Sequence, residues 1–82
     1  MIKTQEFLRY LEAHGARIYN YKKTGYYKAF FGKAYATFDN TQTLGDILFR
    51  GHNPDFDTLR QVVLRFFRMR DIHTYYDDAH DI

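Results

Sequence analysis

Three short segments rich in Tyr, Phe and Ile, at residues 16–21, 26–31 and 34–38, follow one another with only a few residues between them. These residue types favour the pleated, half-buried surface of a β-strand. The connections contain Gly25 and Gly32, and glycine adopts the positive φ angles that tight turns need. Strands joined by loops this short pair as neighbours, so the sequence predicts a three-stranded antiparallel meander.

Alternation along these strands predicts two chemically different faces, because successive side chains of a strand point to opposite sides of the sheet. One face is apolar and is expected to meet the helices. It carries Ile18, Ala29, Phe31, Ala36 and Phe38. The other face combines aromatic rings with cations and carries Arg17, Tyr19, Tyr21, Tyr26, Lys28, Phe30 and Tyr35.

A helix is predicted before the meander, from about residue 5 to residue 14. Thr4 is the expected N-cap, because a threonine hydroxyl accepts a hydrogen bond from a first-turn N–H group. Phe7, Leu8 and Leu11 recur at helical spacing. Gly15 is placed to end the helix in the left-handed conformation.

A short helix or a helical turn is predicted next, over residues 43–51. Thr43 and Asp46 resemble a capping box, and Gly51 resembles a helix stop.

A long helix is predicted from residue 53 to residue 71. Asn53 suits the N-cap and Pro54 the first helical position. Its buried stripe is expected to consist of Phe56, Leu59, Val62, Val63, Phe66 and Phe67, with Arg60, Arg65 and Arg68 facing outward. Residues 72–76 suit either an edge strand or a continuation of this helix.

The predicted fold class is therefore α+β, with both main helices packed on one face of the sheet. The 82 residues are room for a single small domain, and we expect residues 77–82 to form a frayed acidic tail. The chain has no cysteine, which excludes disulfides and thiolate chemistry and suits the cytoplasm. No apolar run is long enough to suggest a signal peptide or a membrane span.

Charge is unevenly distributed although the net charge is only +2. Residues 1–38 carry seven Lys or Arg and two Glu, whereas residues 71–82 carry four Asp and no Lys or Arg. Aromatic rings beside cations suit single-stranded nucleic acid, since every base offers a face for stacking and every phosphate a negative charge. The candidate binding residues are Arg17, Tyr19, Tyr21, Lys22, Lys23, Tyr26 and Lys28.

A protein partner is the main alternative, because Tyr and Arg are also favoured at protein interfaces. The domain would then be an accessory or inhibitor protein of phage or plasmid type. It would use the same aromatic face, or the acidic tail as a nucleic-acid mimic. Ordinary solvation of the charged groups is the simplest alternative to both.

An enzyme is the third hypothesis, a nuclease using His14, His73 or His80. No catalytic triad or glycine-rich phosphate loop is evident in the sequence. The His and Asp residues of the tail have metal-ligand chemistry, but their spacing matches no known type of site. We therefore predict a non-enzymatic binding module without a metal or cofactor.

The order of helix, meander and helix resembles double-stranded-RNA-binding-like domains. Residues 4–15, with their apolar helical spacing and closing glycine, are similar to the first helix of the HicA family of toxin ribonucleases, and the resemblance extends to about residue 38. It implies contact with nucleic acid. The family's catalytic His lies at the start of the second strand, where this chain reads Thr24-Gly25-Tyr26-Tyr27, so the resemblance does not imply ribonuclease activity. Three-stranded DNA-binding domains of integrases are similar in the same general way.

Overall fold

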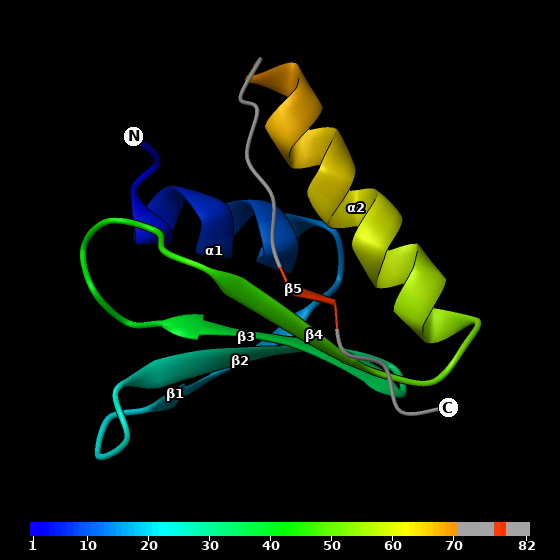
Figure 1. The fold of residues 1–82 in the computed structure, drawn as a ribbon, viewed down its shortest axis with the longest axis horizontal. Coiled ribbons are helices and arrows are strands. Elements are labelled where there is room, and N and C mark those ends of the chain that lie inside the picture. The colour runs from blue at the N-terminus through cyan, green and yellow to red at the C-terminus, as the bar shows by residue number, and fades with distance from the viewer. Residues whose placement is uncertain (71–76, 79–82) are drawn as a thin grey trace.

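The computed structural model describes residues 1–70 and 77–78 of the chain (Figure 1). Helix α1 comes first and is followed by four strands, a second helix and a two-residue strand. The elements are α1 (Thr4–Ala13), β1 (Arg17–Tyr21), β2 (Tyr26–Phe31), β3 (Ala34–Asp39), β4 (Ile47–Gly51), α2 (Asp55–Met69) and β5 (Asp77–Asp78).

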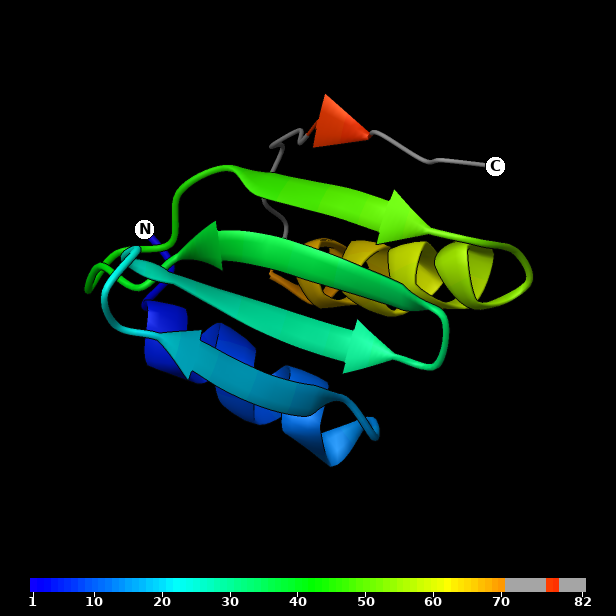
Figure 2. The same ribbon diagram turned by 90° about the horizontal axis from the view of Figure 1, so that it is seen from below.

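Strands β1 to β4 form an antiparallel meander in which each strand pairs with the next one along the chain. The two residues of β5 pair in parallel with Leu48 and Phe49 of β4. Both helices pack on the same face of the sheet (Figure 1). Seen from below the view of Figure 1, the strands lie in front and the helices behind them (Figure 2). This arrangement confirms the predicted α+β class and the packing of both helices on one face.

The pairing register confirms the predicted division of the first three strands into two faces. Ala29 lies between Ile18 and Ala36, and Phe38 pairs with Tyr27, all on the face toward the helices. We call this the inner face. The opposite face, called the outer face from here on, carries Arg17, Tyr19 and Tyr21 of β1, Tyr26, Lys28 and Phe30 of β2, Tyr35, Thr37 and Asp39 of β3, and Leu48 and Arg50 of β4.

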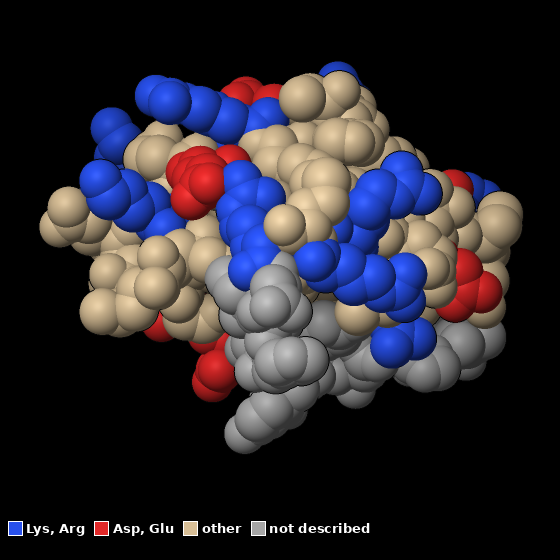
Figure 3. Space-filling view, turned by 90° about the horizontal axis from the view of Figure 1, so that it is seen from above, with Lys and Arg blue, Asp and Glu red and all other residues tan. Residues whose placement is uncertain are grey.

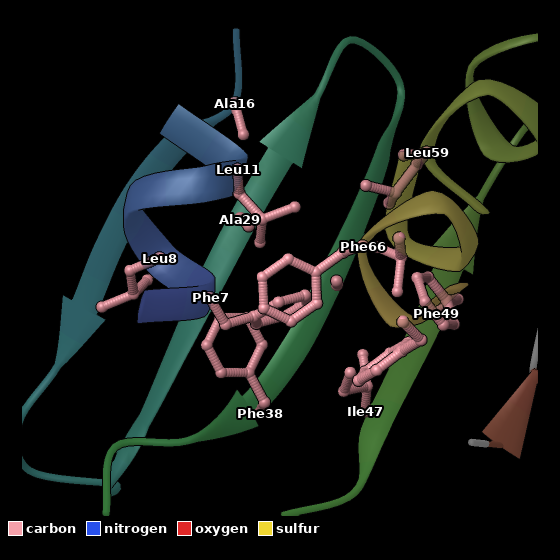
Figure 4. Close-up of a cluster of buried hydrophobic side chains, with 14 of the residues drawn as sticks. Phe7, Leu8, Leu11, Ala16, Ala29, Phe38, Ile47, Phe49, Leu59 and Phe66 are labelled. Atoms are coloured by element: carbon pink, nitrogen blue, oxygen red, sulfur yellow. The ribbon is translucent and has the colours of Figure 1, made fainter. Parts of the chain in front are cut away.

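The hydrophobic core fills the space between the inner face and the two helices (Figure 4). Phe7 of α1 lies at its centre and is fully buried. The Phe7 ring meets Phe38 and Phe66 edge-on, with centroids 5.0 and 5.1 Å away, and stacks with Phe67 at 6.0 Å. Edge-to-face ring pairs at these distances contribute about 0.5–1.5 kcal/mol beyond the burial of their area. One aromatic cluster therefore joins both helices to the sheet.

The short helix predicted over residues 43–51 is wrong, because Ile47–Gly51 is the fourth strand. Its burial alternates, with Ile47, Phe49 and Gly51 buried and Leu48 and Arg50 half-buried between them. This period of two matches a strand and places Phe49 opposite Ala36 of β3. Pairing with β3 outweighed the local capping pattern, and the meander has four strands where three were predicted.

The predicted N-caps of both helices are wrong, whereas Gly15 has the predicted positive φ angle, +96°, directly after the C-cap of α1. Lys3 occupies the N-cap of α1 with extended backbone, and Thr4 is the first helical residue. The Thr4 N–H donates to the Gln42 carbonyl at 2.9 Å, so a neighbouring chain segment replaces the side-chain cap. In α2 the N-cap is Pro54, whose carbonyl accepts the Thr58 N–H at 3.1 Å, and Asn53 lies before it in a cis peptide bond.

No helix of the described residues is long and apolar enough to cross a membrane. The alternatives for residues 72–76 lie outside the described residues. The frayed tail predicted for residues 77–82 also lies outside them, except for Asp77 and Asp78, whose backbone pairs with β4.

Candidate nucleic-acid interface

Aromatic rings form a continuous line across three strands of the outer face. The Phe30 ring of β2 lies between Tyr19 of β1, 5.5 Å away and edge-on, and Tyr35 of β3, 5.3 Å away and tilted. Tyr21 and Tyr26 form a second pair near the β1–β2 turn, with centroids 5.3 Å apart. Each pair joins residues on neighbouring strands, so the sheet register itself creates this surface.

Lys28 occupies the middle of this surface. Its ammonium Nζ lies 4.7 Å from the centre of the Tyr35 ring, 5.6 Å from that of Tyr21 and 5.9 Å from that of Tyr26. A cation within about 6 Å of a ring centre is attracted by the negative charge of the ring face. These contacts keep a positive charge at the centre of the aromatic surface.

A hollow of about 340 Å³ opens on the outer face beside β1. Tyr19, Tyr21 and Phe30 supply rings to its lining, Arg17 supplies a guanidinium group, and Gly32 supplies only backbone. Tyr19 is 47% exposed and Tyr21 is 39% exposed, and both are among the most exposed large apolar side chains of the described residues. Large contiguous exposed apolar patches are typical of interaction sites, whereas single exposed apolar side chains are ordinary.

Negative charge is scarce at the outer-face positions of β1 to β4. Asp39, at the end of β3, is the one carboxylate among the outer-face positions of β1 to β4, whereas Arg17, Lys28 and Arg50 are cations there. The helix-bearing face also carries Lys and Arg, but acidic groups lie among them (Figure 3). On that side the Arg70 guanidinium donates to the Glu6 carboxylate. What distinguishes the outer face is therefore cations beside exposed rings.

The seven candidate residues lie in one region of the molecule. Five are on the outer face, on β1 and β2. Lys22 and Lys23 are exposed in the turn that joins these two strands. The β1–β2 hairpin thus brings all seven together.

Sequence reasoning placed Phe30 and Tyr35 on this face but left them out of the candidate site. It missed the contribution of β4 altogether. Arg50 is the outer-face partner of Tyr35, and Leu48 that of Thr37. The alternation of Ile47, Phe49 and Gly51 with Leu48 and Arg50 was the available signal, and the capping pattern concealed it.

The nuclease hypothesis names three histidines, of which the structure describes His14. His14 lies away from the outer face. Its Nδ1 is 2.8 Å from the Tyr10 carbonyl, and its ring packs 4.2 Å from the Tyr10 ring at the end of α1. His73 and His80 lie outside the described residues. Within the described part of the chain, no group of three or more His, Asp or Glu side chains is arranged to hold a metal ion.

Comparison of this chain with protein-family models, curated proteins and solved structures finds no match. The resemblance to HicA-like and double-stranded-RNA-binding-like domains stays a prediction, and the fourth strand departs from the three-stranded order on which it was based.

Proposed function

We propose that this domain is a non-enzymatic module that binds single-stranded nucleic acid on the outer face of its sheet. The observation that carries the proposal is the ring surface formed by Tyr19, Phe30 and Tyr35 with the Lys28 ammonium beside it. Base stacking on such rings contributes about 1–3 kcal/mol per base. Phosphate contacts from the cations add an attraction that does not depend on sequence.

The cations surround the rings in a way that suits a strand lying across the sheet. Lys28 is central, Arg17 lies at the start of β1, and Lys22 and Lys23 extend from the turn at its end. A strand whose bases stack on the rings would keep its phosphates within reach of these side chains. The cations repel one another, so an anionic ligand that neutralises them is favoured.

Single strands fit this surface better than duplexes. The bases of a duplex are stacked on one another, and their faces are not available to protein rings. The outer face is built of strands, and no helix of the described residues projects from it toward a groove (Figure 2). Ring faces, rather than groove-reading elements, are what this surface offers.

The test is fluorescence anisotropy with labelled single-stranded and duplex DNA and RNA, at about 50 and 200 mM salt, where phosphate contacts lose much of their affinity. We expect saturable binding of single strands that weakens at the higher salt. Binding of duplexes as tightly as single strands, or no binding of any nucleic acid at 50 mM salt, would contradict the proposal.

Two variants connect the binding to the outer face. Tyr21→Ala removes an exposed ring and should weaken single-strand binding by about tenfold, the lower part of the stacking range. Lys28→Gln should reduce the slope of log affinity against log salt by about 0.7, the value for one phosphate contact on a single strand. Arg9→Gln removes one charge from the exposed side of α1 and is the matched control. It should leave the slope nearly unchanged.

A protein partner is the second candidate, and the position of β1 favours it. Among the described residues, β1 pairs with β2 only and forms an edge of the sheet. Edge strands accept an extended segment from another chain through backbone hydrogen bonds. If no nucleic acid binds, capture of a partner that Tyr21→Ala releases and that tolerates 200 mM salt would support this alternative.

A further inference from the structure

We infer that the hollow beside β1 is a subsite for one unstacked nucleotide, with its base against Phe30 and Tyr19 and its phosphate on Arg17. This inference rests on the proposed function and adds where one unit of the strand is held. The hollow is shallow, and it brings the rings of Tyr19, Tyr21 and Phe30 and the guanidinium group of Arg17 around one space.

The two rings of the hollow form a corner. The Tyr19 and Phe30 planes are 82° apart, with centroids at 5.5 Å. A planar base that stacks on the face of one ring therefore lies nearly perpendicular to the other ring and makes an edge-to-face contact with it. Aromatic groups favour both of these contacts, face-to-face with an offset and edge-to-face. A corner of rings fixes the orientation of a base, which a single flat ring does not.

The size of the hollow fits one nucleotide. Its volume of about 340 Å³ lies at the lower end of the range for pockets that hold small molecules, about 300–1,000 Å³. A base inside a duplex could not enter it without leaving its stack. A nucleotide held in this hollow would therefore be unpaired.

The charge of the lining indicates where the phosphate lies. Arg17 is exposed and is the one charged residue among the described residues of the lining, none of which is a carboxylate. A guanidinium group donates two parallel hydrogen bonds to a phosphate and keeps its charge at any physiological pH. Arg17 is also the cross-strand neighbour of Phe30, so phosphate and base contacts come from adjacent positions of the sheet.

The experiment is an NMR titration of the isotope-labelled protein with adenosine monophosphate, adenosine and inorganic phosphate in parallel, and with a single-stranded oligonucleotide. We expect the monophosphate to shift the signals of Arg17, Tyr19, Phe30 and Gly32 while those of Thr37 and Leu48 stay in place. The oligonucleotide should shift signals across the whole outer face. Adenosine should produce the same local pattern more weakly.

Arg17→Ala should weaken monophosphate binding by about tenfold, the loss expected for a charge-assisted hydrogen bond, and leave adenosine binding unchanged. Arg9→Ala, on α1, is the control for net charge and should change neither the affinity for the monophosphate nor the affinity for adenosine. If the oligonucleotide binds but the monophosphate does not shift the lining, or inorganic phosphate alone reproduces its shifts, the subsite is wrong and the proposed function stands. If neither the oligonucleotide nor the monophosphate binds, both fail.

Discussion

At Gly51, the last residue of β4, the chain approaches β3 so closely that a side chain has no room. Gly51 pairs with Ala34 and has a φ angle of +136°, in the region that residues with a side chain rarely adopt. A β-carbon there would lie 2.7 Å from the β-carbon of Ala34 and would collide with its backbone. The small residues on both strands are what lets β4 pair with β3 at this point.

Gly51→Ala should therefore lower the free energy of unfolding by about 1–3 kcal/mol, the cost of a strained backbone position, and the collision adds to this value. Gly45→Ala is the matched control, because a β-carbon at that position meets no atom within 4 Å. It should change stability by less than about 0.5 kcal/mol, as surface substitutions usually do. Urea denaturation followed by circular dichroism measures both, and equal effects would contradict the interpretation.

At the scale of elements, Asp55 connects the start of α2 to the turn between β2 and β3. Its carboxylate accepts the Lys33 backbone N–H at 2.7 Å. The Lys33 carbonyl in turn accepts the His52 N–H at 3.1 Å. As an acidic residue in the first turn, Asp55 also favours the helix dipole. The orientation of α2 on the sheet thus depends in part on this one carboxylate.

Asp55→Ala should cost about 1–2 kcal/mol, since it removes a charge-assisted hydrogen bond and a favourable charge at the helix start. Asp57→Ala removes an equal charge from the same first turn, at an exposed position. It should cost only the dipole contribution, about 0.3–1 kcal/mol. Thermal unfolding of the two variants separates the effects, and a loss for Asp57→Ala as large as that for Asp55→Ala would overturn the role of the Lys33 contact.

The contact between the two helices should make stability depend on pH in the alkaline range. The Tyr10 hydroxyl of α1 donates to the Val62 carbonyl of α2 at 2.6 Å. Burial raises the pKa of Tyr10 above its ordinary value of 10.0, and the guanidinium groups of Arg65 and Arg70 partly oppose this shift. The folded state thus holds the phenol proton more tightly than the unfolded state does. The contribution of Tyr10 is complete below about pH 10 and is lost as the pH rises through the pKa of the folded state.

Tyr10→Phe removes both the hydrogen bond and this titration. Wild type should lose more of its free energy of unfolding between pH 9 and pH 11 than Tyr10→Phe does, around the ordinary pKa of tyrosine. At pH 7 the variant should be less stable by about 1 kcal/mol, the net value of one hydrogen bond. Urea titrations at the three pH values provide the comparison. Parallel losses in the two proteins would show that Tyr10 does not titrate as described.

At the scale of the whole molecule, the two faces of the sheet divide the aromatic residues between two tasks. The inner rings, with Phe7 at their centre, pack against the helices. The outer rings pack against one another and remain partly exposed. A small domain has little stability to spare, because it buries a smaller fraction of its surface than a large one. The inner cluster therefore supplies most of the buried aromatic area, and the outer rings are the ones on which the proposed function depends.

Phe7→Ala should cost about 3–5 kcal/mol, the usual loss for a large-to-small change in a core. That is a large part of the total for a chain of 82 residues, about 4–12 kcal/mol at 0.05–0.15 kcal/mol per residue. Met69→Ala is the control, because Met69 is 62% exposed near the end of α2. The urea midpoint should fall strongly for the first variant and hardly move for the second. A small loss for Phe7→Ala would mean that the core does not depend on this ring.

Sequence reasoning succeeded where a local pattern and the tertiary environment agree. The alternation in residues 16–38 predicted which side chains of β1, β2 and β3 share each face, and the register confirmed it. It also placed all seven candidate residues on the hairpin that brings them together. Strand alternation carries this information because successive side chains point to opposite faces of the sheet. Residues that alternate between apolar and polar therefore place all their apolar side chains on the same face.

The tertiary structure decided that residues 47–51 form a strand, and it decided the N-caps of both helices. The pattern from Thr43 to Gly51 satisfies a short helix locally, but the open edge of β3 offers backbone partners and a place for Ile47 and Phe49 in the core. The Thr4 N–H likewise finds the Gln42 carbonyl, which is distant in sequence. Long-range hydrogen bonds and burial outweigh propensities of less than about 1 kcal/mol per residue.

The same physical difference applies to the candidate site. The residue types that stack and attract phosphate, and the face they share, follow from the sequence alone. The corner between Tyr19 and Phe30, the position of Lys28 over three rings and the hollow beside Arg17 exist only because the strands pair in one register. Composition and alternation determine which groups are present on a surface, whereas distances between groups on different strands are decided when the sheet forms.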